Sequence, residues 1–309
     1  MRKDMFMEAA KQQRMIGKYR VIRGIGQGGE GEVYLAEDED LHRPVAVKRV
    51  YGQREQEGQE ETGGGILREA EILRQLCHPM LPVLYDLIRE ADVWYLVMEY
   101  IPGITLQESI GKNGPAGEKQ AYAWAGQLLD ILEYLHTRQP PVIYRDLKPQ
   151  NIIVCPDGRL RMVDFGAAHR KDFAAGEGSR MAATRGYGAP EQFGDTGYGA
   201  TADERSDIYA FGKVLYYMVT GADPMQPPYT ALPVWDYQPV LGEGLERIIR
   251  RCIREEPAER YQMAETVRKE LDSGEKRRSG RRRHSFIRVV EKKLWLTEGK
   301  PKAELLQGK

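Results

Sequence analysis

The sequence has few cysteines, few aromatic residues and no long apolar run. Only 9% of its 309 residues are aromatic and 41% are hydrophobic, which is typical of an ordinary globular protein. The three cysteines, Cys77, Cys155 and Cys252, lie far apart and fit no metal-ligand spacing. We therefore expect reduced thiols, as in a cytoplasmic compartment, and neither a disulfide framework nor a cysteine-bound metal.

No stretch of about 18 consecutive apolar residues, the length that spans a bilayer, occurs in the sequence. The first residues carry charges at Arg2, Lys3 and Asp4 and lack the apolar core of a secretory signal. These absences favour a cytoplasmic chain. Peripheral contact with a membrane and an anchor outside the given residues stay open as alternatives.

Neither sign of charge is in excess, since Lys and Arg number 46 and Asp and Glu also number 46. The whole chain therefore gives no reason to expect nucleic acid as a partner. The charge is uneven, because residues 273–309 hold 12 Lys or Arg against 4 Asp or Glu, a net charge of +8. This basic tail, densest over 276–293, is interpreted first as a solvated linker. Contact with an anionic membrane or an acidic partner is the alternative.

The segment YRDLKPQN at 144–151 holds the densest chemistry in the sequence. The carboxylate of Asp146 can accept a proton from an attacking hydroxyl group, and Lys148 can neutralise a phosphoryl group in transit. The amide oxygen of Asn151 is a ligand that Mg²⁺ accepts. These are the groups that phosphoryl transfer requires.

A second oxygen ligand, Asp164, follows thirteen residues after Asn151 in the sequence DFG. Asp157 and Gly158 form a hairpin turn signal between two apolar runs, 152–154 and 160–163. A hairpin there brings Asp164 back beside Asn151. The sequence thus predicts two converging metal ligands without a local cluster of carboxylates.

A glycine-rich hairpin is predicted at 26–33, where GQGGEGEV fits G-x-G-x-x-G-x-V between two runs of strand-forming residues. Glycine lets backbone N–H groups approach phosphate oxygens without interference from a Cβ. The pattern alone is also typical of ordinary turns and of dinucleotide-binding units. A dinucleotide site needs a helix after the glycines, and the strand predicted here favours a flap over a triphosphate instead.

A short apolar strand ends at Lys48, and apolar residues at helical spacing predict a helix from about Ile66 to Leu76. Two glutamates, Glu69 and Glu71, lie on this helix. They are about 200° apart around its axis, so only one of them can face a site shared with Lys48.

Taken together, these segments resemble the eukaryotic-type (Hanks-type) serine/threonine protein kinases, and the Tyr144 variant of the usual His resembles bacterial members. The resemblance covers residues 18–272 and includes TRGYGAPE at 184–191 and DIYAFG at 207–212. It implies an α+β fold of two lobes. An N-lobe (18–101) with an antiparallel sheet and one main helix precedes a mainly helical C-lobe (102–272), flanked by a lead-in (1–17) and the tail (273–309).

The resemblance also implies a role for each matching residue. Asp146 and Lys148 would be catalytic, and Asn151 and Asp164 would hold Mg²⁺, with Mn²⁺ as an alternative. ATP would be bound by residues of the flap, the strands and the hinge: Ile25, Gly26, Gln27, Gly28, Gly31, Val33, Ala46, Lys48, Glu69, Met98, Glu99, Ile101 and Ile153. Five residues would be structural: Tyr144, Phe165, Glu191, Asp207 and Arg260.

Lys148 and Thr184 imply serine or threonine as the acceptor, because tyrosine kinases of the family carry Arg or Ala in place of this Lys. Arg145 would bind a phosphate on the activation loop, which is the segment between Gly166 and Pro190. We expect Ser179 to be the main autophosphorylation site of this loop, since Thr184 is better explained by substrate docking. The alternative is an unphosphorylated loop ordered by the basic residues Arg170, Lys171 and Arg180.

Tyr144 is the one departure from the family pattern. It would join Phe165, Leu73 and Leu84 in a column of packed side chains, and its hydroxyl group would need a partner if buried. A catalytically impaired scaffold and a small-molecule phosphotransferase are the competing functions. A homodimer stays open.

Overall fold

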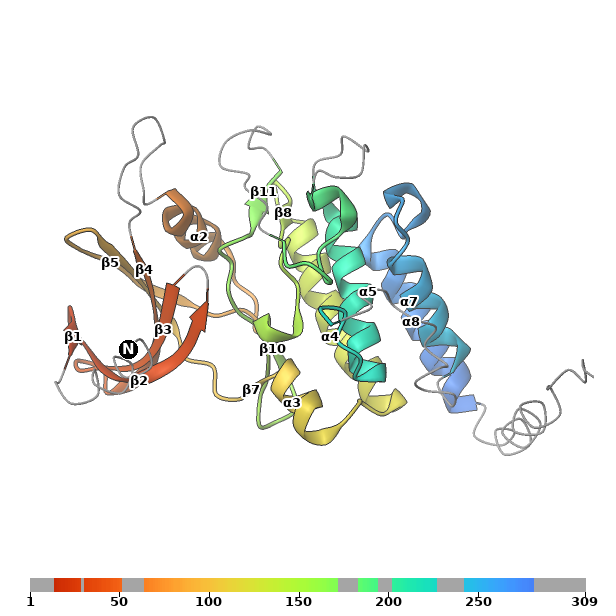
Figure 1. The fold of residues 1–309 in the computed structure, drawn as a ribbon, viewed down its shortest axis with the longest axis horizontal. Coiled ribbons are helices and arrows are strands. Elements are labelled where there is room, and N and C mark those ends of the chain that lie inside the picture. Colours follow the sequence, from red (N-terminus) through yellow and green to blue (C-terminus); the bar gives the residue numbers. More distant parts are fainter. Residues whose placement is uncertain are drawn as a thin grey trace, which may run out of the picture.

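The computed structural model describes residues 14–28, 31–51, 64–171, 183–193, 202–226 and 242–280. Its N-terminal part is an antiparallel sheet of six strands in the order β1-β2-β3-β4-β6-β5, with helix α2 beside it (Figure 1). The elements are β1 (Met15–Ile16), β2 (Tyr19–Gly28), β3 (Gly31–Asp38), β4 (Arg43–Tyr51), α2 (Gly64–Gln75), β5 (Leu84–Glu90) and β6 (Val93–Glu99). The predicted hairpin at 26–33 is confirmed, since β2 pairs with β3 and Gly28 lies opposite Gly31.

Side chains alternate between the two faces of the sheet along each strand, and each face carries buried apolar residues. On one face Val45, Val47 and Tyr34 form a small apolar cluster. On the other face Ala46 and Met98, which lie opposite each other on β4 and β6, join the main core. Helix α2 covers this second face, so the strand that bears Lys48 is fixed against the helix that bears Glu69.

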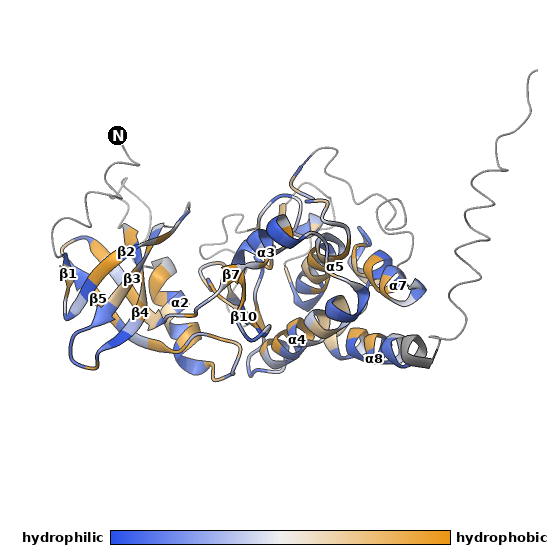
Figure 2. Ribbon diagram, turned by 90° about the horizontal axis from the view of Figure 1, so that it is seen from below, coloured by the Kyte–Doolittle hydropathy of each residue, from blue (hydrophilic) through white to orange (hydrophobic). Residues whose placement is uncertain are grey.

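The C-terminal part is mainly helical, and its hydrophobic residues gather along α4 and α5 (Figure 2). Helix α5 is buried on nearly all sides, as expected for a helix at the centre of a domain. Its ends are capped by the side chain of Asp203 and by Gly221 at φ +70°. The helices are α3 (Leu106–Asn113), α4 (Glu118–His136), α5 (Glu204–Thr220), α7 (Glu243–Cys252) and α8 (Ala264–Gly280), with short 3₁₀ turns η1 (Pro149–Asn151), η2 (Pro190–Phe193) and η3 (Pro257–Glu259).

Two small sheets between the sheet and the helices hold the loops of interest. One has the order β10-β9-β7 and the other pairs β11 with β8. Their strands are β7 (Ile104–Thr105), β8 (Val142–Ile143), β9 (Ile152–Val154), β10 (Leu160–Met162) and β11 (His169–Arg170). The hairpin predicted around Asp157 and Gly158 is confirmed by the pairing of β9 with β10.

The predicted bilobal α+β fold is confirmed (Figure 1). Two elements extend past the predicted domain limits of 18 and 272. Strand β1 pairs with β2 and buries Ile16, and α8 continues to Gly280. No helix among the described residues is long and apolar enough to cross a bilayer.

Candidate active site

The loop that carries Asp146 is anchored by one buried carboxylate. Asp207, in the first turn of α5, accepts hydrogen bonds from the backbone N–H groups of Tyr144 and Arg145, both at 2.8 Å. The ring nitrogen Nε2 of His136 lies 2.9 Å from the same carboxylate. These contacts hold Arg145 at φ +70°, a backbone conformation that a side chain other than glycine adopts at a cost. The bend presents Asp146 beyond the end of β8.

Asp146 lies in a compact group of polar side chains. Lys148 Nζ is 2.6 Å from Asp146 Oδ2, and the hydroxyl group of Thr184 donates to Asp146 Oδ1 at 2.7 Å. Lys148 also donates to the Thr184 hydroxyl oxygen at 2.9 Å. Asn151 donates its side-chain N–H to the Asp146 carboxylate at 3.1 Å. The carboxylate thus already accepts an aliphatic hydroxyl donor, as an incoming serine or threonine would require.

Lys48 connects the N-terminal sheet, α2 and the DFG segment. Its Nζ is 2.8 Å from Glu69 Oε2 and 2.6 Å from Asp164 Oδ1. The other Glu69 oxygen accepts the backbone N–H of Phe165 at 3.1 Å. Burial opposes ionisation of Asp164, but the charge and hydrogen bond of Lys48 outweigh it and lower the pKa of Asp164. Asp164 is therefore ionised at neutral pH.

Tyr144 is fully buried, and its hydroxyl group has a partner. It donates to the carbonyl oxygen of Val163 at 2.6 Å, directly before Asp164. Burial raises the pKa of Tyr144 well above its usual value, so the hydroxyl group stays a donor. The ring meets that of Phe165 edge to face at 5.1 Å. Leu73 belongs to the same core cluster and Leu84 packs against it, in line with the column implied by the resemblance.

Asn151 and Asp164 lie close together because Val163 donates its backbone N–H to the Asn151 carbonyl oxygen at 2.9 Å. The side-chain nitrogen of Asn151 is directed to Asp146 and its oxygen is the remaining ligand atom. One carboxylate and one amide oxygen form a hard donor set. Such donors fit Mg²⁺ or Mn²⁺ and not a metal that prefers sulfur or imidazole.

The glycine-rich hairpin places Gly26 opposite Val33 and Gln27 opposite Glu32, while Ile25 is partly exposed on β2. Gly31 has φ +150°, and a Cβ there would lie 2.0 Å from the Arg49 carbonyl oxygen. Backbone packing against β4 therefore requires this glycine whether or not a phosphate binds. The sequence pattern carried no sign of this contact with β4.

The remaining nucleotide candidates lie on β4, at the end of β6 and just after it, and on β9. Ala46, Met98 and Ile101 are nearly buried, and Ile153 is partly buried on β9. The Glu99 carboxylate lies 2.5 Å from Arg161 Nη2, and the Glu99 backbone N–H donates to the Val83 carbonyl oxygen at 2.8 Å. No sequence pattern predicts the Arg161 contact, because it depends on the distance between β6 and β10 in the fold.

The segment after Thr184 is attached to the helical part by a buried ion pair. Arg260 contacts both oxygens of Glu191, at 2.7 and 2.8 Å, and Ser206 donates to Glu191 at 2.7 Å. Gln192 donates to the Arg145 carbonyl oxygen at 3.0 Å, a second link that the sequence analysis missed. No residue pattern marks it, since Gln192 simply follows the buried pair.

Three of the sequence predictions concern residues outside the described ranges. Ser179 lies outside the described residues, as do Arg180 and residues 281–309 of the basic tail.

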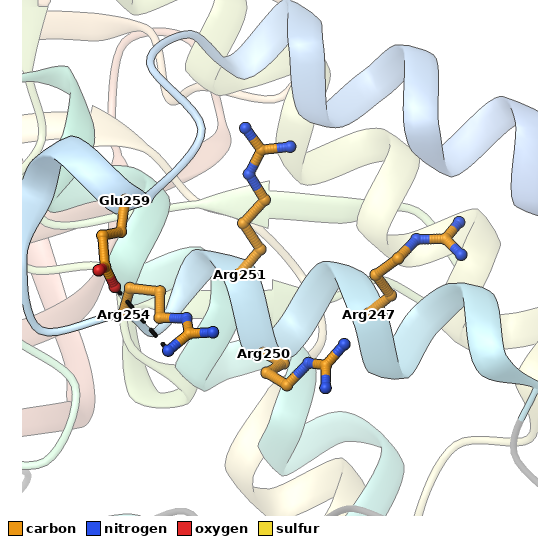
Figure 3. Close-up of a pocket in the computed structure, with 5 residues that line it drawn as sticks. All are labelled: Arg247, Arg250, Arg251, Arg254 and Glu259. Carbon is orange, nitrogen blue, oxygen red and sulfur yellow. Dashed lines mark ion pairs between the residues drawn. The ribbon is translucent and has the colours of Figure 1, made fainter.

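A separate polar surface lies on α7 and lines a hollow of about 280 Å³ (Figure 3). It holds Arg247, Arg250, Arg251, Arg254 and Glu259. Glutamates pair with three of these arginines: Glu270 with Arg247, Glu246 with Arg250 at 3.7 Å and Glu259 with Arg254 at 3.8 Å. The neutral ring of Tyr261 packs 4.2 Å from Arg251. No residue of this surface contributes to the site around Asp146.

The sequence of this chain matches a known protein family and resembles individual known proteins. Residues 19–271 match the family described as protein kinase domain. The chain is 32% identical over 273 residues to serine/threonine-protein kinase PrkC of Bacillus subtilis, covering 84% of this chain and 41% of PrkC. It is 32% identical over 277 residues to serine/threonine-protein kinase PknB of Mycobacterium tuberculosis, covering 82% of this chain and 42% of PknB. The chain spans about two fifths of the length of these curated relatives.

Proposed function

This chain belongs to the protein kinase family, and from that premise we propose that it transfers the γ-phosphoryl group of ATP to serine or threonine hydroxyl groups of proteins. The observation that carries the proposal is the contact of Lys48 with both Glu69 and Asp164. It joins Lys48 of the N-terminal sheet, which would bind phosphate, to Asp164 of the C-terminal part, which would bind the metal. In protein kinases the pair of this Lys with the helix Glu and the binding of Mg²⁺ by the DFG Asp must both be in place for transfer.

The mechanism follows from the residues around Asp146. The carboxylate orients the acceptor hydroxyl group and takes its proton as the oxygen attacks the γ-phosphorus atom. The bond between this phosphorus and the bridging oxygen breaks, and ADP leaves. Lys148, 2.6 Å from Asp146, stabilises the charge of the transferred group, while Lys48 orients the α- and β-phosphates.

Asn151 and Asp164 would hold Mg²⁺, with Mn²⁺ as the alternative, because their oxygens form the donor set that these cations prefer. When bound, the cation neutralises developing phosphate charge. Adding a chelator should abolish transfer, and Mg²⁺ should restore it.

Two competing functions fit the residues less well. A scaffold without catalysis would not need Lys48, Asp146 and Asp164 together, and all three are present and in contact with partners. A small-molecule phosphotransferase would not need the segment from Thr184 to Glu191 tied to Arg260. The first observation favours catalysis, and the second favours a protein acceptor.

The first prediction tests the activity directly. Lys48→Met and Asp164→Asn should each abolish transfer from labelled ATP to a generic protein substrate, because each removes one side of the contact that positions the phosphates. The matched control is Lys269→Met, an exposed lysine of α8 paired with Glu265, which should keep full activity. Near-normal activity in either site variant contradicts the assignment.

We also propose autophosphorylation, with Ser179 as its main site in the activation loop and Arg145 as the residue that binds the phosphate. The support is that Thr184, the neighbouring hydroxyl candidate, is engaged by Asp146 and Lys148. Phosphopeptide mapping of active protein tests it, and phosphate on Thr184 or Tyr187 without Ser179 would count against it.

For location we propose a cytoplasmic kinase domain, with peripheral membrane contact as the alternative. The support for the alternative is the net charge of +8 over 273–309, which would attract an anionic surface or an acidic partner. Vesicles containing anionic lipid should bind the chain at low salt and release it as salt rises. Sedimentation at the same protein concentration distinguishes a monomer from a homodimer.

A further inference from the structure

Arg185 occupies a special position beside the reacting groups. It directly follows Thr184, whose hydroxyl group lies 2.7 Å from Asp146 Oδ1. Its own side chain is exposed, and its guanidinium carbon lies 6.0 Å from the centre of the Phe193 ring. Within the described part of the chain the guanidinium group forms no ion pair. A cation is thus presented to solvent next to the acceptor position.

The neighbours of Arg185 hold it in place. Gly186 has φ +95°, and a Cβ there would lie 2.7 Å from the Pro224 carbonyl oxygen, so the backbone packs closely on that segment. Tyr187 is buried and its hydroxyl group donates to Asp223 at 3.0 Å. Since Thr184 and Tyr187 on either side are held by hydrogen bonds, the backbone of Arg185 has a defined location.

Among the described residues, no ion pair joins Arg185 to the carboxylate of Asp223. Asp223 accepts the Tyr187 hydroxyl group and the backbone N–H of Met225, both at 3.0 Å. Gln150, whose side chain reaches Met225, carries no charge. An extended substrate advances about 3.4 Å per residue. The side chains within one or two residues of the acceptor would therefore lie within reach of the Arg185 guanidinium group.

Resting on the proposed function, we propose that Arg185 selects substrates that carry an anionic side chain, carboxylate or phosphate, within two residues of the acceptor serine or threonine. Arginine suits either group, because its planar fork donates two parallel hydrogen bonds to a pair of oxygens.

The test uses serine peptides that are identical except at one position. Each position within two residues of the acceptor carries Ala, Asp, phosphoserine or Lys in turn. For the wild-type chain, Asp or phosphoserine should raise kcat/KM by about three- to tenfold over Ala at one such position, mainly through KM. Comparing Asp with phosphoserine separates the two anions. The preference should weaken as salt rises.

Arg185→Ala should remove this ratio and Arg185→Glu should reverse it in favour of Lys. The matched control is Arg250→Glu, an exposed arginine on α7, which should keep both the activity and the ratio. The same ranking of peptides in wild type and Arg185→Ala, or no anionic preference in wild type, overturns the inference. If both Arg185 variants are inactive, the wild-type chain alone tests the inference. An anionic preference that weakens with salt supports it, and no such preference overturns it. If wild type phosphorylates no peptide and no generic protein, the proposed function itself fails.

Discussion

Tyr144 shows how one residue links the YRD loop to the DFG segment. The family pattern predicts His at this position, and the longer Tyr raised the question of what its hydroxyl group would bond. The structure answers it with the Val163 carbonyl oxygen, one residue before Asp164. The hydroxyl group of Tyr144 therefore adds a hydrogen bond between the Asp146 loop and the segment that bears Asp164.

Tyr144→Phe keeps the ring contact with Phe165 but removes this hydrogen bond. We expect a loss of about 1–3 kcal/mol in the free energy of unfolding, because a buried hydrogen-bond partner is deleted. The concentration of Mg²⁺ needed for half-maximal activity should also rise, since Asp164 is less well held. Urea unfolding and a Mg²⁺ titration of the activity measure the two effects.

Tyr217→Phe is the matched control, because this buried hydroxyl group donates to the Gln107 carbonyl oxygen at 3.3 Å, away from Asp164. It should cost stability without changing the Mg²⁺ requirement. Tyr144→His should keep measurable transfer. Complete loss of activity in that variant would mean that the role of Tyr144 has been misjudged.

Helix α2 illustrates what an element contributes beyond its residues. Helical periodicity places Glu69 and Glu71 on different faces but does not say which face meets Lys48. In the structure Glu69 is 2% exposed and bonds to Lys48, while Glu71 is exposed. The apolar face of Ile66, Ala70 and Leu73 packs against the core and thereby fixes the rotation of the helix.

Glu69→Gln should lower kcat/KM for ATP by about 10- to 100-fold, because a misplaced Lys48 no longer positions the phosphates. Glu71→Gln, the same chemical change two residues away, should stay within about twofold of wild type, as expected for a change outside the site. Steady-state kinetics with both variants decides this. Equal losses of kcat/KM in the two variants would show that Glu69 is not the glutamate of α2 that positions Lys48.

At the scale of the whole molecule, the buried pair of Glu191 and Arg260 attaches the segment bearing Thr184 and Arg185 to the helical part. Burial opposes the charged form of Glu191, but hydrogen bonds from Arg260 and Ser206 outweigh it and lower its pKa below the ordinary value of 4.5. A lowered pKa means that the stabilisation is fully present above about pH 4.5. It is lost as pH falls through the folded-state pKa.

Glu191→Gln should therefore destabilise the protein by about 3–5 kcal/mol at pH 7, because the charge of Arg260 stays buried without its partner. The difference from wild type should be constant down to about pH 4.5 and shrink below it. Urea unfolding across this range measures it. Glu265→Gln, in the exposed pair with Lys269, serves as the control and should cost less than about 1 kcal/mol. A difference that does not change with pH would contradict the role of the ion pair.

The sequence alone determined the class of the fold and the chemistry of the site. Periodicity predicted the β2–β3 hairpin, the hairpin of β9 and β10, and α2, because alternating and helical patterns are local properties of the chain. The hairpin predicted between Asn151 and Asp164 implied that these two residues would lie side by side.

Only the tertiary structure decided which groups touch across long separations. The contacts of Asp207 with the Asp146 loop, of Tyr144 with Val163 and of Glu99 with Arg161 join residues 19 to 63 positions apart. Gly31 likewise proved to be required by the approach of β4. Such contacts depend on how whole elements pack, and a local pattern carries no information about that packing. The YRD segment therefore identified the reaction, while the fold showed what holds it in place.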